Sequence, residues 1–336
     1  MRGPSARYVL RRFVIFLLTV WVSATIIWVV PRLAPGDPVE ATVARLIADS
    51  GNFPGAQDMI ADWRQRFGLN DPWPIQYLRF IKSAVTLDFG YSLVSFPTPV
   101  IDIIARALPW TIGMLAIATL TAFSLGTVVG ALMAWDRTPR LLRPLLPASM
   151  IFTALPPVLA AVFLLFIFSS LLGWFPTMGA FGRRETPGWN MDFILSVIHH
   201  GTLPALSIVL VSFGSWALSM RAMLVTISGE DYTVLGRAVG FRPGYLLWRF
   251  MVRNAMLPQL TALALALGSL ISGAVLVEAI FNYPGMGTVL VGAIRDQDFN
   301  TIQGAALILI FTAAAAVFVM DLVYPFVDPR ISLEAR

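Results

Sequence analysis

Residues 107–135 have the sequence ALPWTIGMLAIATLTAFSLGTVVGALMAW, which contains no charged side chain. A helix that crosses the hydrocarbon core of a bilayer needs about 20 mostly apolar residues, and this stretch is longer than that. Runs of the same kind occupy residues 9–30, 145–172, 202–220, 256–282 and 302–326. None of them alternates as a membrane β-barrel strand does, and in lipid each segment must satisfy its own backbone polar groups. The sequence therefore predicts an all-α integral membrane protein with six transmembrane helices.

The composition of the chain agrees with this class. Of its 336 residues 57% are hydrophobic and 13% are charged, and the mean hydropathy is +0.75. Soluble domains carry about 25% charged residues, so this chain has too few to cover a water-facing surface. The sequence contains no cysteine, which excludes disulfide frameworks, thiolate metal sites and cysteine nucleophiles. The arginines are scattered between apolar runs, and this pattern argues against nucleic acid as a partner.

The first apolar run, residues 9–30, has two interpretations. A basic start followed by an apolar stretch is also typical of a cleaved signal peptide. This stretch is long for that class, and residues 31–36 offer no clear small-x-small cleavage site. We therefore expect an uncleaved anchor, in which residues 1–30 form a tail and the first transmembrane helix.

Basic residues gather in alternate connecting segments. An excess of arginine and lysine marks the cytoplasmic side of a membrane. The N-terminus and residues 136–144 and 221–255 are rich in arginine, whereas residues 31–103, 173–200 and 283–300 are balanced or mildly acidic. The sequence therefore predicts a multi-pass protein with both termini in the cytoplasm.

The segment 31–103, on the predicted outer side, is too long for a simple connection. Within it, Asp71 and Pro72 are typical of an N-cap and a first helical position. Apolar residues follow at helical spacing: Ile75, Leu78, Ile81 and Val85. We expect an ordered segment that caps the outer face.

The inner segment 221–255 carries a different set of signals. Ser228 to Asp231 has the pattern of a capping box, which predicts a short helix over about 229–239. Gly240 stands where a left-handed C-terminal cap is needed, and a second helix is predicted over 245–254. The segment is either an interfacial helix pair anchored by Trp248 and its arginines, or a binding site through which a cytoplasmic partner moves the spans.

Several motifs in this chain carry a family resemblance. Arg237-Ala238-x-Gly240, followed by Arg253-Asn254-Ala255-x-Leu257-Pro258, resembles the coupling loop (the EAA loop) of bacterial ABC importer permeases, in its peptide-permease variant. Further stretches match that variant in order: Pro35–Pro38, Phe67–Leu69, Pro74–Tyr77, Leu87–Gly90, Glu278–Gly287, Asp321 and Asp328–Arg330. The chain resembles the first of the two permease subunits of a dipeptide or oligopeptide importer. It departs from the family pattern at four coupling positions: Val234, Leu235, Gly236 and Val239.

The resemblance implies a type I ABC importer permease domain over 104–326 with the coupling loop at 221–255, a periplasmic segment at 31–103 and a cytoplasmic tail at 327–336. It implies a place in the bacterial inner membrane. The implied partners are a second homologous permease subunit, two cytoplasmic ATP-binding subunits, an extracytoplasmic substrate-binding protein and the lipid bilayer. The residues it assigns to coupling are Arg237, Ala238, Gly240, Phe241, Asn254 and Pro258.

The sequence itself contains no Gly-Lys-Ser/Thr, so it lacks a phosphate-binding P-loop. We therefore expect this chain not to be an enzyme and to hold no cofactor. ATP and magnesium would be bound by the partner ATPase subunits. His199 and His200 are adjacent and would point to different faces of a helix, so we interpret them as interfacial residues rather than metal ligands.

Ionisable residues and helix breakers in or beside the apolar runs are candidates for structural or gating roles. They are Glu278, Pro284, Gly285, Gly287, Asp321, Pro156 and Pro157. We expect Glu278 to hydrogen-bond the turn at 282–287, with substrate contact as the alternative, and Asp321 to pair with an inner arginine such as Arg221. Pro156-Pro157 should kink the third span. Gly126-x-x-x-Gly130 permits close helix approach, although chance is an equal alternative.

Two questions of function stay open at this stage. The same family of permeases also serves nickel chelates, oligosaccharides and glutathione, and nothing in the sequence separates these cargoes from peptides. An ion-coupled secondary carrier is the main rival class, but the interiors of the second, third and fifth runs offer almost no charged groups for such coupling. A non-transporting membrane scaffold is a third possibility.

Overall fold

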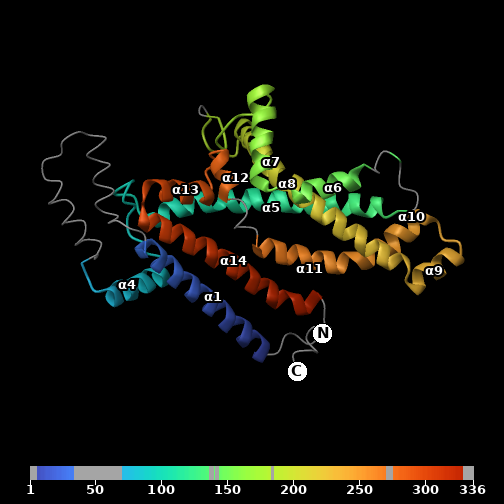
Figure 1. Cartoon of the computed structure of the whole chain (residues 1–336), viewed down its shortest axis with the longest axis horizontal. Helices are drawn as coiled ribbons and strands as arrows, with labels where there is room; N and C mark the ends of the chain where they lie inside the picture. Colours follow the sequence, from blue (N-terminus) through green and yellow to red (C-terminus); the bar gives the residue numbers. More distant parts are fainter. Residues whose placement is uncertain are drawn as a thin grey trace. The chain divides into compact units, whose positions relative to one another are not determined.

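The computed structural model describes residues 6–33, 70–135, 140, 144–182, 185–269 and 275–327. The Pro35–Pro38 motif, most of the 31–69 stretch and the tail after residue 327 lie outside these ranges. The elements in chain order are α1 (Ala6–Leu33), α4 (Trp73–Thr86), α5 (Val100–Met133), α6 (Leu145–Ala154), α7 (Pro157–Leu164), η2 (Leu165–Leu171), α8 (Met191–Ser228), α9 (Asp231–Ala238), α10 (Pro243–Tyr245), η3 (Leu246–Val252), α11 (Arg253–Ser269), α12 (Val275–Ile280), α13 (Met286–Asp296) and α14 (Phe299–Val327). Figure 1 shows them as ribbons coloured along the chain.

Helices make up the regular structure of the described residues, which confirms the all-α class; beside them stands one isolated bridge between Tyr91 and Pro99. Among the described residues, four helices are long and apolar enough to cross a membrane: α1 over Ala6–Val30, α5, α8 and α14 over Phe299–Val323. A bent pair, Leu145–Ala154 with Pro157–Leu171, makes a fifth possible span. The fifth expected span, 256–282, includes most of α11 and all of α12, and residues 270–274 between them lie outside the described ranges.

The third expected span, 145–172, is not a straight helix. Its two halves meet at an angle of 107° where Pro156 and Pro157 stand. Leu155 and Pro156 are extended, and Pro157 opens α7. Proline disfavours the helical conformation in the residue before it and removes a backbone donor, so a proline pair forces this break. The predicted kink is confirmed, and it is much sharper than a bend within one span.

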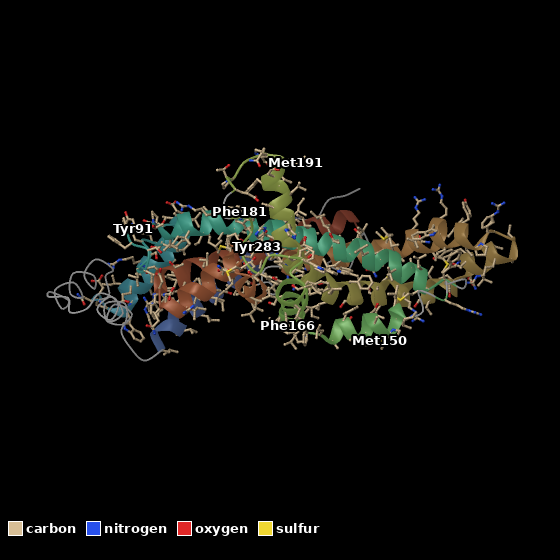
Figure 2. All side chains as sticks on the ribbon, turned by 90° about the horizontal axis from the view of Figure 1, so that it is seen from above. Tyr91, Met150, Phe166, Phe181, Met191 and Tyr283 are labelled. Atoms are coloured by element: carbon tan, nitrogen blue, oxygen red, sulfur yellow. The ribbon has the colours of Figure 1, made fainter. Side chains whose placement is uncertain are left out.

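Contacts divide the chain into two units. The first comprises Met1–Arg12, Ile112–Tyr283 and Ala316–Arg336, and the second comprises Phe13–Thr111 and Pro284–Ala315. Figure 2 shows two apolar side chains of the first unit, Met150 on α6 and Phe166 in η2, projecting from the ribbon. They are 60% and 56% exposed. Apolar side chains on the outside of a helical unit are typical of a protein whose solvent is lipid.

In the first unit, α8 packs against α6, α7 and α11. Gly126 and Gly130 bring α5 close to it as well. A Cβ on Gly126 would lie 2.5 Å from the Trp216 Cβ, and a Cβ on Gly130 would lie 2.9 Å from the Met220 Cβ. Real Cβ atoms do not approach so closely, so this contact needs the glycines. The close helix approach predicted from the two glycines is confirmed.

In the second unit, Asp298 fixes the start of α14. Its carboxylate accepts hydrogen bonds from the Thr301 backbone N–H (3.2 Å), the Thr301 hydroxyl (2.7 Å) and the Ser92 hydroxyl. The first two cap the helix in the usual way. The third comes from the loop before α5, so one buried carboxylate joins that loop to α14.

The helix predicted after Asp71 is present as α4, with two differences. Pro72, not Asp71, is the N-cap residue. The Asp71 carboxylate instead forms an ion pair with the Arg79 guanidinium, with 2.5 Å between Oδ2 and the guanidinium nitrogen. The apolar stripe is not covered by the described residues, since Leu78 is 67% and Val85 80% exposed. The buried side chain of α4 is Phe80.

Candidate functional site

The candidate site is the α9–η3 segment, residues Asp231–Val252, which lies in the first unit. The capping box predicted at its start is wrong. Ser228 ends α8, and its hydroxyl donates to the Val225 carbonyl oxygen at 2.7 Å. Glu230 is the N-cap residue of α9 and makes no side-chain cap hydrogen bond. The long α8 extends to Ser228, the position that the sequence assigned to the cap of the next helix.

The end of α9 is a Schellman turn built on Gly240. This glycine has φ +84°, the left-handed conformation predicted from the sequence. The Phe241 N–H donates to the Gly236 carbonyl oxygen and the Gly240 N–H to that of Arg237, each at 3.0 Å. These are the two hydrogen bonds that define the motif. The turn therefore fixes the direction in which the chain leaves α9.

Gly236, one of the departures from the family pattern, has a packing role in this chain. A Cβ at this position would lie 2.8 Å from Leu246 Cδ1 and 3.3 Å from Phe241 Cδ2. The absence of a side chain lets α9 lie directly on the first residue of η3. The Phe241 ring in turn stacks on Phe250, with ring centroids 5.6 Å apart and planes at 25°.

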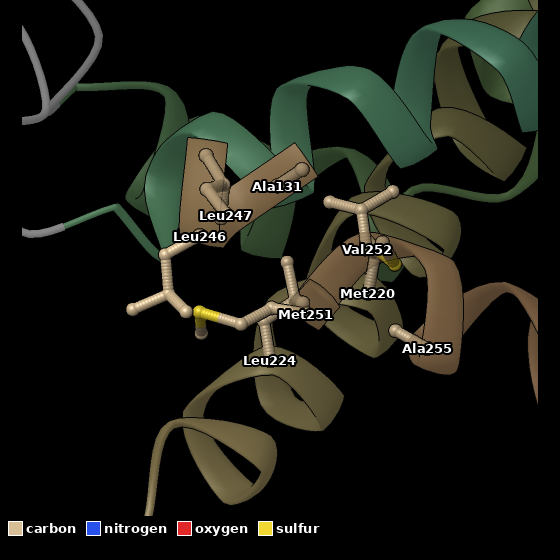
Figure 3. Close-up of a cluster of buried hydrophobic side chains, with 8 residues drawn as sticks. All are labelled: Ala131, Met220, Leu224, Leu246, Leu247, Met251, Val252 and Ala255. Atoms are coloured by element: carbon tan, nitrogen blue, oxygen red, sulfur yellow. The ribbon is translucent and has the colours of Figure 1, made fainter. Parts of the chain in front are cut away.

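The second half of the segment joins α9 to the long helices. From Pro243 the chain continues without a break through α10 and the π-helix η3 into α11, so the predicted second helix is confirmed in a longer form. Apolar residues of η3 pack with α5, α8 and α11 in a buried cluster, shown in Figure 3: Ala131, Met220, Leu224, Leu246, Leu247, Met251, Val252 and Ala255. A displacement of α9 would thus be passed to the ends of α5 and α8.

The opposite side of the segment is open and largely apolar. Val234, Leu235 and Val239 of α9 and its turn are 51%, 64% and 66% exposed, and Trp248 of η3 is 46% exposed. Beside them is a hollow of about 220 Å³, lined by Ala134, Trp135, Arg237, Phe241, Pro243, Leu246, Leu247 and Met251. An exposed apolar patch next to a cationic side chain is typical of a protein interaction site.

The residues assigned to coupling fall into two groups. Arg237, Ala238, Gly240 and Phe241 lie together at the end of α9, and all four are exposed. Asn254 and Pro258 are exposed on α11, beyond the α9–η3 segment.

Of the gating candidates in the first unit, Glu278 lies on α12. Glu278 is fully buried, and its backbone carbonyl oxygen accepts from the Tyr283 N–H at 2.9 Å. The turn that follows has Asn282 at φ +46°. Burial, with the nearby Glu278 charge as the smaller cause, raises the pKa of Tyr283 to about 12. In the second unit, Pro284, Gly285 and Gly287 stand at the start of α13, where the Met286 N–H donates to the Thr111 hydroxyl at 2.8 Å.

Asp321 of α14 forms an ion pair, but not with the predicted arginine. Arg12 of α1 lies 3.2 Å from its carboxylate, and the Tyr8 hydroxyl donates to the Asp321 backbone oxygen at 3.0 Å. The prediction of Arg221 is wrong, because α1 rather than the inner loop supplies the neighbouring cation. The expectation that Asp321 takes part in an ion pair is confirmed.

The two histidines contact different groups. His199 Nε2 donates to the Trp174 carbonyl oxygen at 3.0 Å, and His200 Nδ1 donates to the Ser196 carbonyl oxygen at 2.8 Å. Within the described ranges, no group of three or more His, Cys, Asp or Glu side chains is placed to hold a metal ion.

Comparison with known proteins decides the family. Residues 126–333 match the family described as "Binding-protein-dependent transport system inner membrane component". The chain belongs to this family. It is 32% identical over 331 residues to a putative peptide permease protein of Brucella suis, covering 97% of this chain and 99% of the relative. It is 30% identical over 328 residues to the oligopeptide transport system permease protein AppB of Bacillus subtilis, with coverage of 97% and 99%. It is also 31% identical over 327 residues to the glutathione transport system permease protein GsiC of Escherichia coli K12, with coverage of 96% and 98%.

The family match includes the end of α5 and all elements from α6 to α14, and it begins at Gly126 of the close α5–α8 contact. The residues that the sequence assigned to coupling are exposed ones, and the buried residues of η3 that pack with α5 and α8 were not among them. Leu246, Leu247 and Met251 repeat at helical spacing, which was the available signal for an apolar face on η3. Trp135, after the end of α5, carried no such signal.

Proposed function

We propose that this chain is one of two homologous permease subunits of an ATP-driven importer for short peptides, and that the α9–η3 segment receives motion from a cytoplasmic ATPase. One observation carries the proposal. The short helix α9 has an exposed apolar face, and a Schellman turn and the Gly236–Leu246 contact connect it to the π-helix η3. The apolar residues of η3 pack in turn on α5 and α8. Such a segment has one face for a partner and the other in the body of the permease.

The transport step follows from these connections. ATP-driven closure of two ATPase subunits would displace α9 through its exposed face. Because η3 continues directly into α11 and packs on α5 and α8, the displacement would reorient these helices together. The substrate pathway, shared with the second permease subunit, would then open to one side of the membrane at a time. An extracytoplasmic binding protein would deliver the substrate to the outer opening.

Two further features belong to the proposal. A cytoplasmic location of both termini and of the α9–η3 segment is supported by the excess of arginine in the N-terminus, 136–144 and 221–255. Peptides are the favoured cargo, because the Brucella and Bacillus relatives are named peptide and oligopeptide permeases and glutathione is itself a short peptide. Nickel chelates and oligosaccharides are the alternatives that a cargo screen would separate.

A matched pair of alanine substitutions tests the coupling role. Gly240→Ala forces alanine into a left-handed conformation, at φ +84°, with no other atom in its way. The conformational cost is about 1–2 kcal/mol, or roughly 5–30-fold in the population of the correct turn. Gly244→Ala makes the same chemical change in open space without a positive φ. Gly240→Asn is the intermediate case, because asparagine tolerates the left-handed region better than alanine.

The assay is uptake of labelled peptides into proteoliposomes that contain this chain, its partner permease, the ATPase subunits and the binding protein. We expect Gly240→Ala to lower ATP-driven uptake severalfold, Gly240→Asn to lower it less and Gly244→Ala to leave it unchanged, at equal incorporation. Equal uptake by the Gly240→Ala and Gly244→Ala variants would contradict the coupling role. Uptake driven by an ion gradient without ATP would contradict the transporter class.

A further inference from the structure

One face of α4 is fixed to the C-terminal end of α1. The Trp28 ring lies 5.2 Å from that of Tyr77 and 6.2 Å from that of Trp73, in edge-to-face geometry. The hydroxyls of Thr25 and Tyr77 are 2.8 Å apart. Figure 1 shows α4 lying across this end of α1 rather than continuing it. Because Ala6–Val30 of α1 is long and apolar enough to span a membrane, the contact places α4 where a span meets the membrane surface.

The exposed surface of α4, away from its contacts with α1, carries an apolar stripe with polar and charged residues beside it. Its apolar residues are Ile75, Leu78, Ile81 and Val85, whose spacing of three and four residues places them along one side of a helix. Ile75 is 49%, Leu78 67% and Val85 80% exposed. Arg79, Lys82 and Thr86 are exposed next to this stripe. Lys82 is the only lysine of the whole chain.

The chemistry of this surface fits lipid. At 14 residues, about 21 Å, α4 is too short to cross a hydrocarbon core of about 30 Å. A helix with an apolar stripe, cationic residues beside it and tryptophan at one end is the kind that lies in a membrane interface. The last turns of α1 are apolar and exposed too, since Ile26 is 55% and Val30 58% exposed. The apolar stripe of α4 is thus close to exposed apolar turns of α1, which lipid acyl chains would also cover.

We propose that α4 is an interfacial helix, lying in the leaflet from which the C-terminal end of α1 emerges, with Ile75, Leu78, Ile81 and Val85 against acyl chains and Arg79 and Lys82 at the headgroups. In this position α4 anchors the long segment between α1 and α5 to the membrane surface. The inference does not depend on transport or on which side of the membrane this leaflet faces.

The chain offers a clean experiment, because it has no native cysteine. Leu78→Cys, Val85→Cys and the control Thr86→Cys are each labelled with an environment-sensitive fluorophore in the full-length chain. Thr86 is also exposed on α4, about 100° around the helix from Val85 and on the side of Arg79 and Lys82. Each protein is reconstituted into phosphatidylcholine–phosphatidylglycerol vesicles, with or without lipids that carry a nitroxide quencher near the headgroup end of the acyl chain. Iodide serves as the water-soluble quencher.

We expect blue-shifted emission and severalfold stronger quenching by the nitroxide lipid at positions 78 and 85 than at 86, with the opposite order for iodide. Two outcomes would overturn the proposal. Quenching by iodide at all three positions would mean that the stripe faces water. Blue-shifted emission at 78 and 85 without quenching by the nitroxide lipid would mean that protein, from this chain or another, covers it. Both test positions are highly exposed, so the labels do not disturb a packed core.

Discussion

Replacing Gly130 by alanine should push α5 away from α8. The added Cβ would lie 2.9 Å from the Met220 Cβ and closer still to the Ala217 backbone oxygen. A flexible side chain could turn aside, but a backbone oxygen and a Cβ move only if the whole of α8 moves. Gly113, also on α5, provides the matched control, because a Cβ there would meet no atom within 4 Å.

The size of the effect follows from two opposing terms. Overpacking a tight contact costs typically about 1–3 kcal/mol, whereas exchanging glycine for alanine in a helix gains up to about 1 kcal/mol. With the full helix gain, Gly130→Ala should therefore lose up to about 2 kcal/mol net, and Gly113→Ala should lose nothing or gain slightly. For a chain of this size each kcal/mol corresponds to roughly 2 °C in the melting temperature.

Thermal unfolding of the detergent-solubilised proteins measures the difference. The Gly130→Ala variant should melt below the wild type and the Gly113→Ala variant at or above it. If both variants shift equally, or if the Gly130→Ala variant is the more stable of the two, then α5 and α8 do not approach through this glycine and the packing argument fails.

Three other predictions concern single side chains. Asp298→Ala removes a helix cap and buried hydrogen bonds to a carboxylate, so it should cost on the order of 3 kcal/mol in denaturant unfolding; wild-type stability would contradict the network. Asp321→Asn should cost no more than about 1 kcal/mol, because its partner Arg12 is 38% exposed, and the charge-exchanged pair Arg12→Asp/Asp321→Arg should recover the loss. Burial raises the pKa of Tyr283 from 10.0 to about 12, so the folded form loses stability as the pH rises from 10 to 12. Tyr283→Phe should flatten that part of the pH–stability curve, and an unchanged slope would refute the assignment.

Local signals in the sequence predicted several structural details correctly. The Pro156-Pro157 pair predicted a break because proline acts on its own backbone and on the residue before it, wherever the segment lies. Gly240 was placed in a left-handed cap because the end of a helix needs this conformation and glycine adopts it without steric cost. The helices α1, α5, α8 and α14 were likewise predictable from the length and hydropathy of their apolar runs alone.

Other features depend on which segments meet. The partner of Asp321 had to be chosen among many arginines, and only the packing of α1 beside α14 selects Arg12. Gly236 is a departure from the family pattern in the sequence, and only the folded chain shows that Leu246 packs against it. The local pattern at Ser228 fits a capping box, but α8 extends to this residue and the Ser228 hydroxyl bonds within α8 instead.

The sequence by itself determined that this chain is a helical membrane protein of a known permease family, where its backbone bends, and which short segment is the candidate for coupling. These properties come from hydropathy, backbone conformation and motif order, which act within one segment. Only the tertiary structure decided that η3 ties α9 to α5 and α8, that Gly130 fixes the distance between α5 and α8, and that the stripe of α4 is left uncovered by the described residues. Each of these depends on contacts between residues far apart in the chain. A local sequence pattern does not specify which distant segment packs beside it.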